Sequence, residues 1–370
     1  METVLVLAHA MGRTLVLPPQ QGIYLLEKRD DKGKHKASFT FNDFFHLDQI
    51  AAEEKGLKII SMEEFLTRMG TSGKLISTST GQVLVPPDDG RVDWNNHGLG
   101  RLWEYLRAVG LLPKGWDPGS CIAAIPQSPS VNDTLTLQTL MDDILAEKYG
   151  PIPDVEKDID FVDAPTPVDA STVQRLREML AQRKKLCIYD QTLQAATLIH
   201  FKMDNSEDDS RLLTHFYAFV FFQNWTQDLW TKRFIRDHVR YIDEIMCAAS
   251  RIVYAVRERS TKTNANLKNR TLASGSSYDS FHVRRGDFQY KMTRVEASKL
   301  YEQSKDQLIP GGTLYIATDE RDKSFFKILM DHYDVTFLDD YMHLLTDVNP
   351  NYYGMLDQLV ASKGRGTYFY

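Results

Sequence analysis

The sequence predicts an α/β protein with parallel sheets and two lobes, and three observations support this prediction. Short apolar runs of strand length alternate with segments that are apolar at helical spacing, most clearly at 279–284, 293–308 and 313–317. Such alternation is typical of β-α-β units, whose strands pair in parallel. With 370 residues, the chain is too long for one small core and suits two lobes. No internal repeat indicates a solenoid instead.

The N-terminal segment predicts a helix followed by a buried strand. Residues 2–11 are apolar on nearly every side of a helix, and Gly12 ends that helix. The run 13–19 then reads as a buried strand that two prolines stop. A helix so apolar at residue 2 indicates that further chain should precede it.

The rest of the first lobe is predicted from apolar periodicity, caps and turn residues. Ser61 opens a helix with a capping box that includes Glu64. Helices are expected at 39–46, 96–109, 171–183, 212–222 and 229–257, and strands at 58–61, 122–125, 185–189 and 197–201. Loops are expected at 28–36, 70–95 and, as an acidic, proline-rich crossing, at 151–168.

A polar stretch at 259–277, rich in Ser, Thr and Asn, predicts a linker between the lobes. The sequence therefore divides into an N-terminal lobe at 1–258 and a C-terminal lobe at 278–370. In the second lobe, strands are expected at 279–284, 313–317 and 335–338, with helices at 293–308, 320–333 and 350–363.

The bulk composition is that of a soluble globular protein, with 42% hydrophobic and 25% charged residues. The net charge of −6 argues against a nucleic-acid partner, which favours a basic surplus. No apolar run reaches 18 residues, so no membrane span is expected. Residues 1–7 lack the basic leader of a signal peptide.

Cys121, Cys187 and Cys247 all lie in apolar segments. No two of them have metal-ligand spacing, and their odd number gives no disulfide framework. We therefore expect three buried thiols.

The strongest candidate for a ligand site is the end of the strand at 279–284. His282, Arg284 and Arg285 stand there, just before Gly286 breaks the strand. The carboxyl ends of strands are where α/β folds bind ligands. Because a guanidinium presents paired N–H donors that match phosphate oxygens, the expected ligand is a diphosphate. The structural alternative is a surface strand whose basic residues pair with Asp287 and nearby acids.

Two further segments could contribute to the same site. Thr318 and Asp319 end the strand at 313–317, where they would either face the ligand or simply cap the helix that begins near Glu320. Asp357 is an acid on an otherwise apolar helix face. It could accept two N–H donors from a guanine edge, or it could face solvent.

Other common site motifs are missing from the sequence. It contains no Gly-x-Gly-x-x-Gly and no Walker loop. The Asp-x-Asp pattern of metal-dependent sugar transfer occurs only at Asp158 and Asp160, and this pair does not follow a strand. No metal site and no cofactor are therefore expected.

The three segments, in this order, resemble the GDP-fucose protein O-fucosyltransferase family. The residues that carry the resemblance are FHVRRGDF at 281–288, YIATD at 315–319 and DQLVASKGR at 357–365, with AMGRTLVLPP at 10–19 in support. The match spans nearly the whole chain, and the His-x-Arg-Arg-Gly-Asp element is its specific part.

The resemblance implies a GT-B fold, in which two Rossmann-like lobes with parallel sheets enclose a cleft. It implies an N-terminal acceptor-side lobe, a C-terminal nucleotide-binding lobe, and inverting, metal-independent transfer of fucose from GDP-fucose to a Ser or Thr hydroxyl. By motif match, Arg284 is the catalytic residue, contacting the β-phosphate and the glycosidic oxygen. His282, Thr318 and Asp319 would lie beside the nucleotide, and Asp357 would recognise guanine.

The resemblance also assigns Arg285 and Asp287 to bracing the loop. Compared with the family, the chain lacks a Gly-Gly-x-Asn loop before its first helix and a Ser-Thr-Phe turn after residue 370. We therefore expect a chain truncated at both cleft edges. The second hypothesis that this favours is a non-catalytic or fragmentary GDP-sugar-binding or protein-interaction domain of the same fold.

The expected partners are GDP-fucose and a protein or glycan acceptor. The family implies the secretory lumen, either the endoplasmic reticulum or the Golgi. Three glycosylation sequons, at Asn132, Asn224 and Asn269, are consistent with that location.

Overall fold

A computed structural model describes most of the chain, and the statements that follow concern the described residues. These are residues 2–22, 38–53, 56–87, 98–111, 113, 116, 121–128, 130–148, 170–201, 219–267, 275–285 and 295–369. The expected loops at 28–36 and 151–168, the pair Asp158 and Asp160, and the residues Gly286, Asp287 and Asn269 lie outside these ranges.

The chain forms two compact units. The first contains Met1–Gln21 and Ser38–Arg240, and the second contains Tyr241–Tyr370. Both are mixed α/β structures whose main sheets are parallel, as the sequence predicts. None of the helices among the described residues is long and apolar enough to span a membrane.

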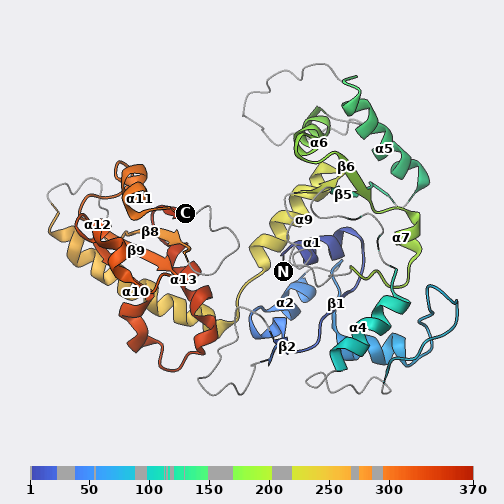
Figure 1. The fold of residues 1–370 in the computed structure, drawn as a ribbon, viewed down its shortest axis with the longest axis horizontal. Coiled ribbons are helices and arrows are strands. Elements are labelled where there is room, and N and C mark those ends of the chain that lie inside the picture. The colour runs from blue at the N-terminus through green and yellow to red at the C-terminus, as the bar shows by residue number, and fades with distance from the viewer. Residues whose placement is uncertain are drawn as a thin grey trace. The chain divides into compact units, whose positions relative to one another are not determined.

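The first unit is built around a three-stranded parallel sheet of order β6-β5-β7 (Figure 1). The strands are β5 (Cys121–Ile125), β6 (Lys185–Ile188) and β7 (Val220–Phe222). One face packs on α5 (Val131–Leu145) and α6 (Ala170–Gln182), and the other on α1 (Glu2–Ala10) and α9 (Trp225–His238). Because both faces are covered, all five residues of β5 are buried.

The remaining elements of this unit are shorter. β1 (Leu15–Leu17) pairs in parallel with β4 (Ile59–Ser61), and Gly12, at φ 61°, ends α1 as expected. Ser61 caps α3 through the N–H of Glu64, also as predicted. The other elements are β2 (Gln21–Gly22), β3 (Ser38–Phe39), a 3-10 turn (Phe41–Asp43), α2 (Leu47–Glu53), α3 (Met62–Phe65), a π turn (Leu66–Gly70), α4 (Gly98–Val109) and α7 (Gln191–Ala195).

The second unit holds a four-stranded parallel sheet of order β10-β9-β8-β11. Its strands are β8 (Asp279–Val283), β9 (Thr313–Thr318), β10 (Asp334–Thr336) and β11 (Thr367–Phe369). Leu300 of α11 (Ala297–Ser304) and Leu329 of α12 (Lys327–Met330) pack on one face. Helices α10 (Asp243–Ala265) and α13 (Tyr353–Ala361) contact β9 and each other. Three 3-10 segments complete the unit, Lys323–Phe326, Leu338–Leu344 and Pro350–Tyr352.

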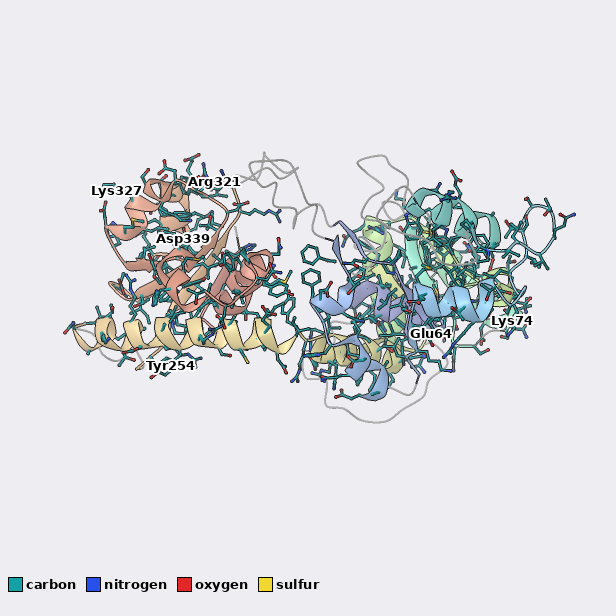
Figure 2. All side chains as sticks on the ribbon, turned by 90° about the horizontal axis from the view of Figure 1, so that it is seen from below. Glu64, Lys74, Tyr254, Arg321, Lys327 and Asp339 are labelled. Atoms are coloured by element: carbon teal, nitrogen blue, oxygen red, sulfur yellow. A yellow bond between two sulfur atoms is a disulfide. The ribbon has the colours of Figure 1, made fainter. Side chains whose placement is uncertain are left out.

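Figure 2 shows α10 along one side of this unit, with Tyr254 on the outward side of the helix. Arg321 and Lys327 lie on the opposite side of the unit. Tyr254 is 72% exposed, so this face of α10 is a solvent face.

Several expected elements differ in the structure. The helix expected at 229–257 is two helices, because Val239 takes an extended conformation after α9 and α10 begins only at Asp243. Helix α10 continues to Ala265, so the first part of the predicted linker is helical. The apolar residues 220–222 form strand β7 rather than the end of a helix.

Other differences concern short elements. The strand expected at 197–201 is reduced to a single bridge between Ile199 and Leu111. The helix expected at 320–333 is a 3-10 turn followed by the four-residue α12. Helix α5 and strand β11 were not expected from the sequence.

The expectation of three buried thiols is wrong. Cys121 and Cys187 form a disulfide with a Cα–Cα distance of 5.8 Å, and Cys247 is exposed on α10. Strands β5 and β6 are neighbours, and Cys187 pairs with Ala123, two residues after Cys121. Both side chains therefore point to the same face of the sheet, within reach of each other.

Candidate active site

The predicted site residues of the second unit follow two paired strand ends. In the parallel register, His282 of β8 lies opposite Ala317 of β9, and Val283 lies opposite Thr318. Arg284 and Asp319 therefore leave the sheet side by side at its carboxyl edge. This edge is where open α/β sheets bind ligands.

The guanidinium of Arg284 stands at this edge with part of its surface exposed. Its Nε lies 3.8 Å from Oδ2 of Asp319, and its side chain is 38% exposed. A separation of 3.8 Å is too long for a hydrogen bond, so the contact with Asp319 is a loose ion pair. The exposed part of the Arg284 side chain could meet an anion.

Arg285 is held differently from its neighbour. Its Nε donates to Oε2 of Glu320 over 3.0 Å, and its Nη1 donates to the carbonyl of Val295 over 3.2 Å. The guanidinium carbon lies 3.6 Å from the centre of the Phe325 ring. These contacts hold the Arg285 side chain against Glu320, Val295 and Phe325. That Arg285 braces the loop stays a prediction, because residues 286–294 lie outside the described ranges.

His282 is half-buried at the end of β8. Burial, followed by the positive charge of Arg284, lowers the pKa of its imidazole below the ordinary value, although Asp319 acts in the opposite direction. The ring is therefore neutral at neutral pH and presents one N–H donor and one acceptor.

Asp357 projects from α13 toward the end of β9. Its Oδ1 accepts a hydrogen bond from the hydroxyl of Tyr315 over 2.6 Å. Burial raises the pKa of the Asp357 carboxyl to about 7, although the Tyr315 hydroxyl, the charge of Lys323 and the backbone of Thr318 all favour the ionised form. A carboxyl of this kind changes its charge near neutral pH, which is typical of functional sites.

Thr318 and Asp319 use hydrogen bonds within the turn. Oγ1 of Thr318 accepts from the N–H of Glu320 over 3.1 Å, and Oδ1 of Asp319 accepts from the N–H of Arg285 over 2.7 Å. The 3-10 turn that follows is capped by Asp322, which accepts from Ser324 N, and not by Asp319. Contact of Thr318 and Asp319 with a nucleotide remains a prediction.

Two hydrogen bonds tie β8 to the end of α13. The hydroxyl of Tyr278 donates to the carbonyl of Val360, and that of Ser280 to the carbonyl of Ala361, each over 2.7 Å. These carbonyls belong to the last turn of the helix, where backbone acceptors lack helical partners. The strand that carries His282 and the helix that carries Asp357 are thereby joined.

Tyr315 and Lys323 also belong to this site, although the sequence patterns did not indicate them. Tyr315 is fully buried in β9, and alternation along the strand places it on the same face as Thr313. Lys323 lies 3.3 Å from Asp339 and contributes its charge to Asp357. A buried tyrosine within a strand was the one available signal, because its hydroxyl needs a partner.

This edge can therefore offer three kinds of group to one ligand. Arg284 offers a cation, His282 a neutral ring, and Asp357 a carboxylate on the neighbouring helix. Among the residues that the structure describes, no group of three or more His, Cys, Asp or Glu could hold a metal ion.

Comparison with protein families gives a match over nearly the whole chain. The family model described as GDP-fucose protein O-fucosyltransferase matches residues 1–369. A search of curated proteins finds no match to this chain.

Proposed function

The chain belongs to the GDP-fucose protein O-fucosyltransferase family and is a glycosyltransferase, and from this premise we propose that it transfers fucose from GDP-fucose to a Ser or Thr hydroxyl of a protein. The proposed transfer inverts the sugar carbon and uses no metal ion. The family match also motivates a GT-B arrangement of the two units as part of the proposal.

The single observation that carries this proposal is the exposed Arg284 at the carboxyl edge of the β8–β9 pair. When the bond between fucose and GDP breaks, negative charge develops on the β-phosphate oxygen that leaves. A fixed guanidinium at that oxygen stabilises the charge more in the transition state than in the ground state, which is what accelerates the step. In this proposal Arg284 is the catalytic residue.

Asp357 is proposed to select the base. Guanine presents a ring N–H and an amino group on one edge, and an ionised carboxylate can accept from both. Hydrogen bonds and charge nearby favour the ionised form of Asp357 at a pKa of about 7. The two N–H donors of a bound guanine would also favour the ionised form of Asp357. His282, beside Arg284, is proposed to lie along the nucleotide.

The disulfide supports the proposed location in the secretory lumen. Cys121 and Cys187 are 0% and 4% exposed and form the disulfide within the core of the first unit. Disulfides persist in oxidising compartments and are rare in the cytosol. The sequon residues Asn132 and Asn224 are both exposed, as glycan acceptors must be.

Calorimetry with GDP tests the proposal without knowledge of the acceptor. Arg284→Ala should weaken GDP binding about 10-fold or more, because a charge-assisted contact is worth roughly 1.5–3 kcal/mol. The matched control is Arg321→Ala, which removes an exposed guanidinium from the segment after β9 and should leave binding unchanged. Equal GDP affinity of the wild type and Arg284→Ala would remove the proposal.

A further inference from the structure

Lys323 places a cation just after the end of β9. It begins the 3-10 turn Lys323–Phe326, and its Nζ donates to the carbonyl of Glu320 over 2.8 Å. The same Nζ lies 3.3 Å from Oδ2 of Asp339 and 4.9 Å from the centre of the Phe337 ring. These three contacts hold the ammonium near the carboxyl edge of the sheet.

The charge of Lys323 also reaches Asp357. Burial raises the pKa of the Asp357 carboxyl to about 7, whereas the charge of Lys323 acts to lower it and that of Asp339 to raise it. Among the described residues, however, Lys323 forms its ion pair with Asp339 and not with Asp357. The ammonium and the carboxylate proposed to bind guanine are therefore neighbours that do not neutralise each other by direct contact.

The ammonium of Lys323 has donor capacity for a ligand. An ammonium carries three N–H donors and no acceptor. The carbonyl of Glu320 accepts from one of them, and the carboxylate of Asp339 faces a second. As far as the described residues show, the third N–H is left for another acceptor. The side chain of Lys323 is 29% exposed, so a ligand can reach it.

Guanine presents three polar groups in a row on one edge. Two of them are the amino group and the ring N–H that Asp357 is proposed to accept. The third, next to the ring N–H, is the carbonyl oxygen O6, which is an acceptor. An ionised carboxylate has no donor for O6. A site that reads the whole edge therefore needs a donor beside the carboxylate, and Lys323 supplies one within electrostatic reach of Asp357.

We propose that Lys323 is a specificity-determining residue, which donates a hydrogen bond to O6 of the guanine whose N–H groups Asp357 accepts. Glu320 and Asp339 hold the ammonium for this contact. Adenine carries an amino donor in place of O6, so ADP would set donor against donor and be rejected. This inference rests on the proposed function, since it takes the base to be guanine.

Calorimetry at pH 7 with GDP and 6-thio-GDP tests the inference on the full chain. The analogue keeps both N–H groups for Asp357 but replaces O6 by sulfur, which is a weak hydrogen-bond acceptor. Lys323→Met removes the charge and keeps much of the side chain, and Lys323→Arg keeps a cation with N–H donors. The matched control is Lys327→Met, because Lys327 follows in the same segment and forms an exposed ion pair with Asp331. Thermal melting shows whether each variant is folded.

The wild type should bind 6-thio-GDP roughly 5- to 10-fold more weakly than GDP, because sulfur weakens a hydrogen bond from a charged donor. Lys323→Met should weaken GDP binding roughly 15- to 30-fold but 6-thio-GDP binding only about threefold, so the preference for oxygen should largely disappear. The remaining threefold reflects the charge that Asp357 loses from its surroundings. Lys323→Arg should keep most of the preference, and Lys327→Met should behave as the wild type.

Two results would overturn the inference. Equal losses for GDP and 6-thio-GDP in Lys323→Met would mean that Lys323 acts only on Asp357 or on the fold. Equal affinity of the wild type for the two nucleotides would mean that no donor meets O6, whether or not Lys323→Met folds. A wild-type chain that binds neither nucleotide would instead remove the proposed function, and the inference with it.

Discussion

The hydroxyl of Tyr315 donates a hydrogen bond to Oδ1 of Asp357 over 2.6 Å, joining the centre of β9 to α13. Burial, with the nearby charge of Asp357, holds the pKa of Tyr315 well above its ordinary value. The phenol is therefore a permanent donor. It favours the charged form of a carboxyl that burial alone would keep protonated.

Tyr315→Phe should weaken GDP binding at pH 7. Loss of the donor raises the pKa of Asp357 further, so a smaller fraction of the protein carries the carboxylate that guanine needs. We expect a roughly 3- to 10-fold loss of affinity, about the worth of one hydrogen bond to a charged group. Much of the loss should disappear at pH 8.5, where Asp357 is ionised again. Tyr254→Phe, on the exposed face of α10, is the matched control. A loss that is the same at both pH values would contradict this explanation.

The affinity for GDP should rise with pH between about 6 and 8. The pKa of Asp357 is about 7 in the folded chain against 3.8 for an ordinary aspartate carboxyl, and only the ionised form accepts two N–H donors. Asp357→Asn should bind weakly at every pH and remove the slope. A wild-type affinity that stays flat over this range would show that Asp357 does not read the base.

The same carboxyl should make the free protein less stable as the pH rises. Its pKa is higher in the folded state than in the unfolded state, so the folded state binds more protons between pH 4 and 7. The stability that this gives is present at low pH and is lost as the pH rises through about 7. The melting temperature of Asp357→Asn minus that of the wild type should therefore be higher at pH 8 than at pH 5.5. An unchanged difference between the two pH values would refute the assignment.

The disulfide of the first unit should be detectable by alkylation. Under denaturing, non-reducing conditions one of the three cysteines should react, and all three should react after reduction. Because the bridge spans 66 residues, its loss should cost about 4 kcal/mol in the chain-entropy model. Cys121→Ser should therefore lower the melting temperature, whereas Cys247→Ser should leave it unchanged. Alkylation of all three cysteines without reductant would disprove the bridge.

Asp334 should be a main contributor to the stability of the second unit. It accepts hydrogen bonds from Nε and Nη2 of Arg259, and from the hydroxyls of Thr263 and Thr313. Asp334→Ala leaves these donors without their acceptor and should cost about 2–3 kcal/mol in unfolding free energy. Asp331→Ala, in the exposed pair with Lys327, should cost less than about 0.5 kcal/mol. Chemical denaturation measures both, and similar costs would contradict the prediction.

The contribution of Asp334 to folding stability changes with pH in the opposite direction to that of Asp357. Burial acts to raise the pKa of Asp334, but hydrogen bonds from Arg259 and Thr263 outweigh it, so the pKa lies below the ordinary value. Its contribution to stability is therefore present at neutral pH and is lost as the pH falls through the folded pKa.

The sequence predicted the two central strands of the second unit well. The strand expected at 279–284 and that at 313–317 agree with β8 and β9 to within one residue. Both are bounded by clear breaks, and their apolar content fits a sheet buried on both faces. Since site residues in such folds follow strand ends, correct strands also placed Arg284 and Asp319 side by side.

The errors arise where tertiary contacts decide the outcome. Helical periodicity continues through residues 239–242, so nothing local signals the break between α9 and α10. The short apolar run at 220–222 fits a helix as well as a strand, and only its pairing with β5 distinguishes them. The disulfide depends on the adjacency of β5 and β6, which spacing between cysteines cannot reveal.

The hydrogen bonds from Tyr278 and Ser280 to the last turn of α13 connect the two ends of the proposed nucleotide site. They tie the helix that carries Asp357, the proposed acceptor for guanine, to the strand that precedes Arg284, the proposed contact of the β-phosphate. A nucleotide with one phosphate too few can then satisfy either end but not both. The proposed site would therefore favour nucleoside diphosphates, both free and sugar-linked, over the monophosphate.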